Sequence, residues 1–276
     1  MSGISTNIIN KMIVPALTFF NNDLSIDWTA NQRYAERLAV YPIHGVIIFG
    51  STGEGSSLST AERIKLTEIY SQCLNKNQHL YVVLGYSNVL DEKSIITTST
   101  DRVTGYLLLP KSENKRIDPY DKRRLKWLTH SIPSDKKIYL YSLKKTTGIS
   151  FVDPSVVTEL IQEGIPIDGL KISHEELDVI KDLITLRTWR NQPLDLLWGS
   201  DRHIEESLTY GTSFLVSSML ACYPNQQSFQ NDALFLKELT DLRKSVGKGA
   251  AKLSIMKEQI SSSVHGTTTV RPPYVN

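Results

Sequence analysis

The sequence predicts a TIM (β/α)8 barrel of the α/β class with additional C-terminal helices. Eight apolar runs of strand length recur along the chain, and helical patterns separate them. Several of these runs are apolar almost throughout, as expected for strands that are buried on both faces. The length of 276 residues also suits a single barrel of this type, which usually needs about 250 residues.

The predicted strands alternate with helices, which indicates parallel strands joined by helical crossovers. A doubly wound open sheet is the alternative fold, but it uses only about five or six strands and would leave the remaining runs unassigned. In chain order, the predicted strands are 12–19, 44–50, 80–86, 105–110, 137–143, 168–173, 195–200 and 212–219.

Several helix boundaries carry recognisable capping signals. Ser59 followed by Glu62 forms the pattern of a capping box. Asp153 has the character of an N-cap, with Pro154 at the first helical position. Gly211 is predicted to follow the end of a helix, where glycine is favoured.

We expect two parts along the chain: the barrel in residues 1–225 and a helical extension packed on it in 226–276. Hydrophobic residues make up 40% of the sequence, which allows a large core and argues against disorder. The net charge is +2, so the whole molecule has no electrostatic drive toward nucleic acid or membrane. The basic stretch 118–127 is interpreted as the solvated face of a helix.

The two cysteines, Cys73 and Cys222, lie far apart and form no CxxC pattern. A disulfide framework or a zinc site is therefore not expected, and a reducing, cytoplasmic location is the default. The first residues lack the apolar segment of a signal peptide, and no run of about 20 apolar residues predicts a membrane span.

In a TIM barrel the active site lies at the carboxyl ends of the strands, so the residues that end each run are the candidates. The second run is followed by GSTGEG, residues 50–55. A Walker phosphate loop is disfavoured, because no lysine follows the last glycine. A glycine-rich turn with exposed N–H groups and two hydroxyls suits a carboxylate, although an ordinary strand-to-helix turn is the alternative.

The sixth run contains Lys171, an amine within an apolar strand. Burial favours the neutral, nucleophilic form of an amine, which is the form that attacks a ketone; a lysine that extends to solvent is the alternative. Tyr139 and Tyr141 in the fifth run share one face, where a phenol can move protons or simply pack. Asp201 after the seventh run is expected to cap the next helix.

Together these segments resemble the pyruvate-dependent class I aldolases and lyases typified by dihydrodipicolinate synthase and N-acetylneuraminate lyase. The strongest match is the turn at residues 50–54, which corresponds to the G-T-T-G-E of this family. Weaker matches occur, in the expected order, in PALTFFNNDLSID, YSLKKTTG, GLKIS, the stretch from WGSD to YGTSFLVSS, and the terminal RPP.

The resemblance implies a Schiff-base mechanism. Lys171 would form the Schiff base with the keto carbon of pyruvate, and Tyr141 would act as general acid and base beside it. Thr52 would link Tyr141 into a proton relay. Gly50, Ser51 and Thr52 would bind the pyruvate carboxylate through backbone N–H groups and the Ser51 hydroxyl.

The resemblance further implies that the carbonyl of Leu215 lies near the lysine. No cofactor is expected, and the sequence shows no metal-binding motif; the partners that the resemblance implies are a small keto acid, pyruvate, and an aldehyde. A homo-oligomer, either a dimer or a tetramer, is expected from the same resemblance.

The chain departs from the family pattern at second-substrate positions. Thr146 stands where dihydrodipicolinate synthases carry an arginine, and Ser112 stands where a relay tyrosine is usual. Lys144 or Lys145 is a candidate for replacing the lost positive charge. Three functional hypotheses therefore remain: a dihydrodipicolinate synthase-like lyase or aldolase, a 2-keto-3-deoxy sugar acid aldolase, and a diverged protein that binds a keto acid without efficient turnover.

Overall fold

The computed structural model describes residues 8–99, 101–110, 117–142, 154–173, 177–178, 180–183, 194–247 and 251–272. Eight strands hydrogen-bond in chain order and close into a barrel. The strands are β1 (Met12–Pro15), β2 (Gly45–Ile48), β3 (His79–Leu84), β4 (Val103–Leu108), β5 (Lys137–Ser142), β6 (Gly169–Ile172), β7 (Asp195–Trp198) and β8 (Phe214–Val216). Each overlaps one of the predicted runs, so the predicted (β/α)8 fold is confirmed.

By its internal contacts the chain forms two compact units. One combines Met1–Leu80 with Ser217–Asn276, and the other is Tyr81–Val216. The predicted division between residues 225 and 226 separates the barrel from the C-terminal helices and does not concern internal contacts. It stays a prediction. The fold is described below within each unit.

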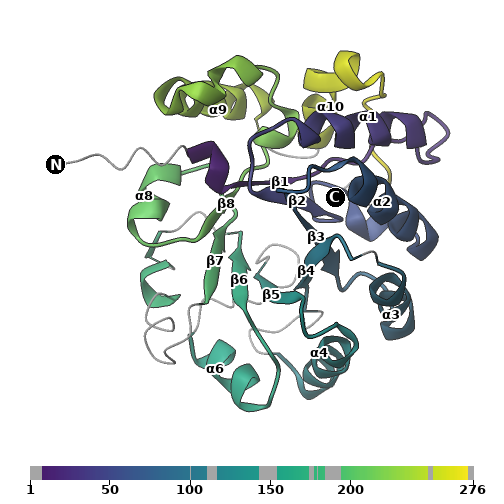
Figure 1. The fold of residues 1–276 in the computed structure, drawn as a ribbon, viewed down its shortest axis with the longest axis vertical. Helices are drawn as coiled ribbons and strands as arrows, with labels where there is room; N and C mark the ends of the chain where they lie inside the picture. The colour runs from purple at the N-terminus through teal and green to yellow at the C-terminus, as the bar shows by residue number, and fades with distance from the viewer. Residues whose placement is uncertain are drawn as a thin grey trace. The chain divides into compact units, whose positions relative to one another are not determined.

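In the unit Tyr81–Val216, the strands β4 to β8 form parallel ladders. All four residues of β6 are buried, and in β5 only the first residue is exposed. Burial on both faces explains why these strands show no alternation of polar and apolar residues. Figure 1 shows β5, β6 and β7 side by side, with α4 (Pro119–Ser131) and α6 (Pro154–Gln162) outside them.

Helix α4 differs in part from its prediction as a solvated basic face. Arg124 and Asp121 are buried and form an ion pair at 2.7 Å. The Arg124 guanidinium also donates to the carbonyl of Leu109 at 2.7 Å, just beyond β4. The prediction was wrong for Arg124, because its side chain extends toward the strand end instead of toward water.

In the other unit, α1 (Trp28–Ala39) packs on α2 (Thr60–Cys73) and on α10 (Lys252–Val264), as Figure 1 also shows. The Tyr34 hydroxyl in α1 donates to the carbonyl of Ala221 at 2.7 Å. That carbonyl lies in the short 3-10 helix η3 (Leu220–Cys222), which follows β8. The C-terminal residues of this unit are therefore joined to its N-terminal residues by buried contacts.

The remaining described helices are short 3-10 turns and three further α-helices. They are η1 (Ile8–Lys11), η2 (Gly55–Ser57), η4 (Gln226–Gln230), α3 (Val89–Thr98), α8 (Ile204–Thr209) and α9 (Asp232–Val246). No helix in the described part of the chain combines the length and the apolar character that a membrane span requires.

The capping box at the start of α2 is confirmed. The Ser59 hydroxyl accepts from the Glu62 N–H at 3.2 Å, and Glu62 accepts from the Ser59 N–H at 2.8 Å. Pro154 opens α6 as predicted, whereas Asp153 lies outside the described residues.

The two ends of α8 differ in how well they were predicted. Gly211 follows the helix with a φ of 91°, in the left-handed region expected for a glycine after a helix. The N-cap assigned to Asp201 is wrong, because α8 begins at Ile204 after His203. His203 itself adopts the left-handed conformation, and its side chain makes no capping bond.

Candidate active site

Lys171 and Tyr141 lie side by side, each near the carboxyl end of its strand. Tyr141 in β5 pairs with Lys171 in β6 in the parallel register, so the two side chains point to the same face. The Lys171 Nζ lies 3.7 Å from the centroid of the Tyr141 ring. Lys171 is only 5% exposed and Tyr141 only 1%. The structure thus brings together the amine and the phenol, as the family resemblance implied.

Ser173, directly after β6, is the hydrogen-bond partner of this amine. The Lys171 Nζ donates to the Ser173 Oγ at 3.0 Å, and no carboxylate among the described residues pairs with Lys171. A nucleophilic amine must lose its proton, and a carboxylate partner would oppose that loss. Sequence reasoning missed Ser173, although its position two residues after Lys171 is the signal for a shared face.

Gly199, which follows β7, leaves space for both of these side chains. A Cβ at this position would lie 2.8 Å from the Ser173 Oγ and 3.3 Å from the Lys171 Cε. The Gly199 N–H continues the strand ladder by donating to the carbonyl of Ile172 at 2.7 Å. The glycine is required above all by the backbone, because the same Cβ would lie 2.8 Å from the carbonyl oxygen of Ile172.

Tyr139, two residues before Tyr141, has a packing role. Its hydroxyl donates to Asp195 Oδ2 at 3.2 Å, and its ring meets the Tyr81 ring edge-on at 5.7 Å. Burial, reinforced by the neighbouring Tyr81 and Asp195, raises the pKa of Tyr139 far above its ordinary value. Tyr139 therefore stays protonated, and the packing alternative considered for this pair of tyrosines holds for it.

The GSTGEG turn follows β2 and is closed by three backbone hydrogen bonds. The Gly50 carbonyl accepts from the Gly53 N–H at 3.0 Å and from the Gly55 N–H at 3.2 Å. The Ser51 carbonyl accepts from the Glu54 N–H at 3.2 Å. Two consecutive carbonyl groups therefore point into the turn.

The direction of these carbonyls orients the next two N–H groups. In a trans peptide unit the C=O and the N–H point in opposite directions. The N–H groups of Ser51 and Thr52 belong to the peptide units of those two carbonyls, so they point out of the turn. Within the described residues neither N–H has an acceptor. Two adjacent N–H groups with this orientation are suited to an anion.

The turn depends on its predicted glycines only in part. Positive φ angles occur at Glu54 (53°) in the turn and at Phe49 (65°) just before it. A Cβ at Gly50 would meet nothing within 4 Å, so this glycine is not required by space. Gly53 is required, because a Cβ there would lie 2.6 Å from the carbonyl oxygen of Ala16.

The predicted site residues fall into both compact units. Gly50, Ser51 and Thr52 belong to one, and Lys171 and Tyr141 belong to the other. The geometry above is therefore given within each unit, and the relay from Thr52 to Tyr141 stays a prediction.

The remaining predicted positions are less well defined. Leu215 in β8 is buried and pairs with Trp198, and the role of its carbonyl stays a prediction. Ser112, Thr146 and both candidate lysines, 144 and 145, lie outside the described residues. Among the described residues, no group of three or more His, Cys, Asp or Glu side chains is arranged to hold a metal ion.

The fold and the site together define a (β/α)8-barrel protein with a buried lysine beside a tyrosine ring and a serine hydroxyl. The sequence profile of the Dihydrodipicolinate synthetase family matches residues 8–234, so the chain belongs to that family. It is a family of class I lyases and aldolases, for which the lysine Schiff base is typical.

Individual relatives are distant. An uncharacterized DapA-like lyase of Chloroflexus aurantiacus is 28% identical over 222 residues, which cover 79% of this chain and 71% of the relative. YagE of E. coli, solved in complex with pyruvate, superposes with a TM-score of 0.77 at 18% identity over 96% of this chain and 92% of its own. A variant of the Sulfolobus solfataricus 2-keto-3-deoxygluconate aldolase gives 0.76 at 21% identity over 95% and 89%. At such identities the solved structures bear on the fold alone.

Proposed function

We propose that this protein is a Schiff-base lyase or aldolase that acts on pyruvate or a related 2-keto acid. One observation carries the proposal: the Lys171 amine is buried over the Tyr141 ring and bonded to a neutral hydroxyl. Membership of the Dihydrodipicolinate synthetase family supports it. So does the similarity in fold to YagE, whose structure contains pyruvate.

In the proposed reaction, the neutral amine of Lys171 attacks the keto carbon and forms a carbinolamine. The Tyr141 hydroxyl gives a proton to the carbonyl oxygen and then assists the departure of that oxygen as water. The product is an iminium ion on Lys171, with Thr52 passing protons between Tyr141 and its surroundings.

The iminium ion withdraws electrons from the adjacent methyl group, which loses a proton and becomes the carbon of an enamine. This carbon attacks the aldehyde and forms a carbon–carbon bond, and the reverse sequence cleaves that bond. Addition of one water then releases the product and restores the free amine.

The same proposal assigns the substrate carboxylate to the GSTGEG turn. The outward N–H groups of Ser51 and Thr52 and the Ser51 hydroxyl would bind the carboxylate, with the Gly50 carbonyl fixing the direction of the Ser51 N–H. The carbonyl of Leu215 would accept a hydrogen bond near the lysine.

Borohydride trapping tests the proposal directly. The protein is incubated with pyruvate, reduced with borohydride and weighed intact. We expect a mass increase that matches one reduced pyruvate, because reduction converts the imine into a stable secondary amine. Lys171→Ala is expected to lose this adduct, since it removes the only nitrogen that the proposal uses.

A matched lysine variant separates specific from random modification. Lys181 is exposed and pairs with Asp178 at 2.9 Å in the same unit, so Lys181→Ala is expected to keep the adduct. No adduct in the parent protein, with pyruvate binding still detectable by calorimetry, would favour the hypothesis of a protein that binds a keto acid without turnover.

A 2-keto-3-deoxy sugar acid aldolase is the second candidate. The observation that favours it is Thr146, at the position where the resemblance to dihydrodipicolinate synthases expects an arginine. Without that arginine, a sugar aldehyde suits the second-substrate position better than an aldehyde that carries a carboxylate.

We also propose a cytoplasmic location and assembly into a homo-oligomer, either a dimer or a tetramer. The cysteine usage supports the first part, and membership of the family supports the second. Light scattering on the purified protein measures the assembly state.

A further inference from the structure

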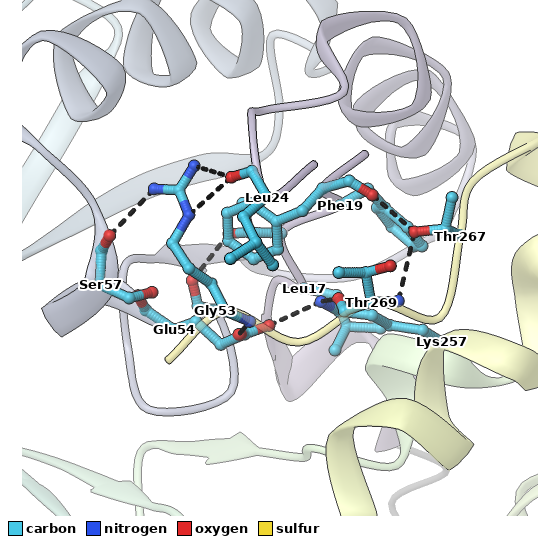
Figure 2. Close-up of polar contacts among 12 residues, drawn as sticks. Leu17, Phe19, Leu24, Gly53, Glu54, Ser57, Lys257, Thr267 and Thr269 are labelled. Carbon is cyan, nitrogen blue, oxygen red and sulfur yellow. Dashed lines mark hydrogen bonds and ion pairs between the residues drawn. The ribbon is translucent and has the colours of Figure 1, made fainter. Parts of the chain in front are cut away.

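The segment after α10 lies against the loop that follows β1. The Thr267 hydroxyl donates to the carbonyl of Phe20 at 2.5 Å, and the Thr269 hydroxyl contacts Asn22 Oδ1 at 3.3 Å. A Cβ at Gly266 would lie 2.6 Å from the Phe19 ring, so the segment approaches the loop closely. Figure 2 shows this segment beside the residues of the GSTGEG turn.

Glu54 of the turn is tied to this segment by a buried ion pair. The Lys257 Nζ donates to Glu54 Oε1 at 2.6 Å, and both side chains are 0% exposed. Lys257 also donates to the carbonyl of Thr269 at 2.5 Å, as Figure 2 shows. Burial raises the pKa of Glu54 and lowers the pKa of Lys257, and the attraction between the two charges opposes both shifts.

Arg271 completes the attachment. Its backbone N–H donates to Glu54 Oε2 at 2.8 Å. Its guanidinium forms two bonds to the Glu62 carboxylate, at 2.9 Å each, and one to the carbonyl of Ser57 at 2.9 Å. Two further bonds reach the carbonyl of Leu24, at 2.9 and 2.6 Å. All five guanidinium N–H donors are thereby used.

Phe20 adds an aromatic surface to this cluster. The Lys257 Nζ lies 4.7 Å from the centroid of its ring, and the Arg271 Cζ lies 4.4 Å from it. Both distances fall within the range of cation–π attraction. The Lys257 ammonium is therefore held by the loop after β1 as well as by Glu54, and the Arg271 guanidinium by that loop as well as by Glu62.

The contacts of Glu54 with Lys257 and Arg271 affect the turn through the peptide unit between Ser51 and Thr52. The Glu54 N–H bonds the Ser51 carbonyl, and the same peptide unit carries the outward N–H of Thr52. Glu54 also has a left-handed φ of 53°, a conformation that a residue with a side chain keeps only when its surroundings hold it. Holding the Glu54 side chain therefore also holds the direction of the Thr52 N–H.

We propose that Glu54, Lys257 and Arg271 are positioning residues that keep the GSTGEG turn in the conformation that binds the substrate carboxylate. This inference rests on the function proposed above. A network that only stabilises the fold would affect unfolding without changing how the site distinguishes ketones. A positioning network changes the preference for a ketone that has a carboxylate.

The experiment compares two ketones in the borohydride assay. Pyruvate has the carboxylate, and acetone has the ketone without it. The half-saturating concentration of each is measured for the parent, for Arg271→Gln and for the double variant Glu54→Gln/Lys257→Met, which removes both buried charges together. Lys244→Met is the control, because Lys244 forms an exposed ion pair with Asp241 in the same unit.

We expect the half-saturating pyruvate concentration to rise about tenfold in both variants, the loss of roughly one oriented, charge-assisted hydrogen bond. The acetone value should stay within about twofold of the parent, so the preference for pyruvate falls about tenfold. Arg271→Lys keeps the positive charge but not the five-donor geometry. We expect it to lower the preference for pyruvate over acetone less than Arg271→Gln does.

The outcomes separate the two proposals. Absence of imine with either ketone in the parent contradicts the proposed function. Imine formation in the parent, with an unchanged pyruvate-to-acetone preference in folded variants, overturns the positioning role. If circular dichroism shows that the double variant is unfolded, the positioning role is tested with Arg271→Gln and Arg271→Lys alone.

Discussion

At the scale of single residues, the proposed reactive amine depends on the space that its neighbours leave. Lys171 lies between the Tyr141 ring, the Ser173 hydroxyl and the backbone at Gly199. Only a residue without a Cβ fits at Gly199, because the carbonyl of Ile172 would lie 2.8 Å from an added Cβ. This requirement gives a direct test.

We expect Gly199→Ala to slow imine trapping with pyruvate by about tenfold or more, because the added methyl group displaces Ser173 and Lys171 from their observed positions. The measurement is the rate of adduct formation at saturating pyruvate, with a thermal melt to verify folding. Ser173→Ala is the companion variant, since it removes the hydroxyl and leaves the space. A folded Gly199→Ala protein with the parental trapping rate would contradict the assigned role.

A second test at this scale concerns His44, which stacks on His79 with ring centroids 4.4 Å apart. Burial, and then the neighbouring His79, lower the pKa of His44 to about 4. The unfolded chain has an ordinary histidine pKa of about 6.5. Between these values only the unfolded state binds the proton, so stability is lost as the pH falls through this window.

We therefore expect His44→Gln to show a smaller decrease in melting temperature than the parent between about pH 7 and pH 4.5. Thermal melts at the two pH values measure the difference. The exposed His130 provides the control, and His130→Gln should keep the parental decrease. An equal decrease in His44→Gln and the parent would show that another group causes the loss.

At the scale of elements, the start of α2 shows how local chemistry sets a boundary close to the site. Ser59 precedes the helix and satisfies the Glu62 N–H, while the Glu62 carboxylate binds both the Ser59 N–H and Arg271. The helix start is therefore linked to the C-terminal segment through Glu62.

We expect Ser59→Ala to lower the free energy of unfolding by about 1 kcal/mol, because the Glu62 N–H loses its side-chain acceptor. Urea denaturation followed by circular dichroism measures this change. Ser262 lies exposed within α10, so Ser262→Ala should be neutral or slightly stabilising. Equal effects of the two substitutions would mean that the cap contributes nothing.

At the scale of the whole molecule, the choice of aldehyde separates the two enzyme candidates. With pyruvate present, we expect glyceraldehyde to be consumed about tenfold faster than aspartate semialdehyde, because Thr146 gives no bidentate partner to a second carboxylate. Pyruvate consumption at equal aldehyde concentrations measures both rates, with Lys171→Ala as the blank. A preference for the semialdehyde would favour the dihydrodipicolinate synthase-like activity instead.

Much of the fold was accessible from the sequence, because the relevant signals are local. The apolar runs marked the strands, and Ser59 with Glu62 marked a helix start that the structure contains. Asp201 shows the limit of such reasoning: it is a good capping residue near a helix, yet α8 begins only at Ile204. After β7 the chain does not enter a helix until Ile204, so the preference of Asp201 for the N-cap position is not realised.

From residue patterns alone the site was accessible only as separate residues, and it was the family resemblance that implied Tyr141 beside Lys171. Lys171 was notable as an amine in an apolar strand, and Tyr141 as a phenol on another strand. Their contact depends on the register between β5 and β6, which no local pattern specifies. The contacts of Ser173 and Gly199 with Lys171 could be recognised only in the folded structure.

By itself, therefore, the sequence determined the barrel and several helix boundaries, and it indicated Lys171 as the candidate amine, since periodicity and capping act over a few residues. Tertiary structure alone decided what surrounds these groups. Glu54 and Lys257 lie 203 positions apart in the chain, yet they form a buried pair beside the GSTGEG turn. Such a pairing depends on how the chain closes on itself, and a pattern of neighbouring residues carries no information about it.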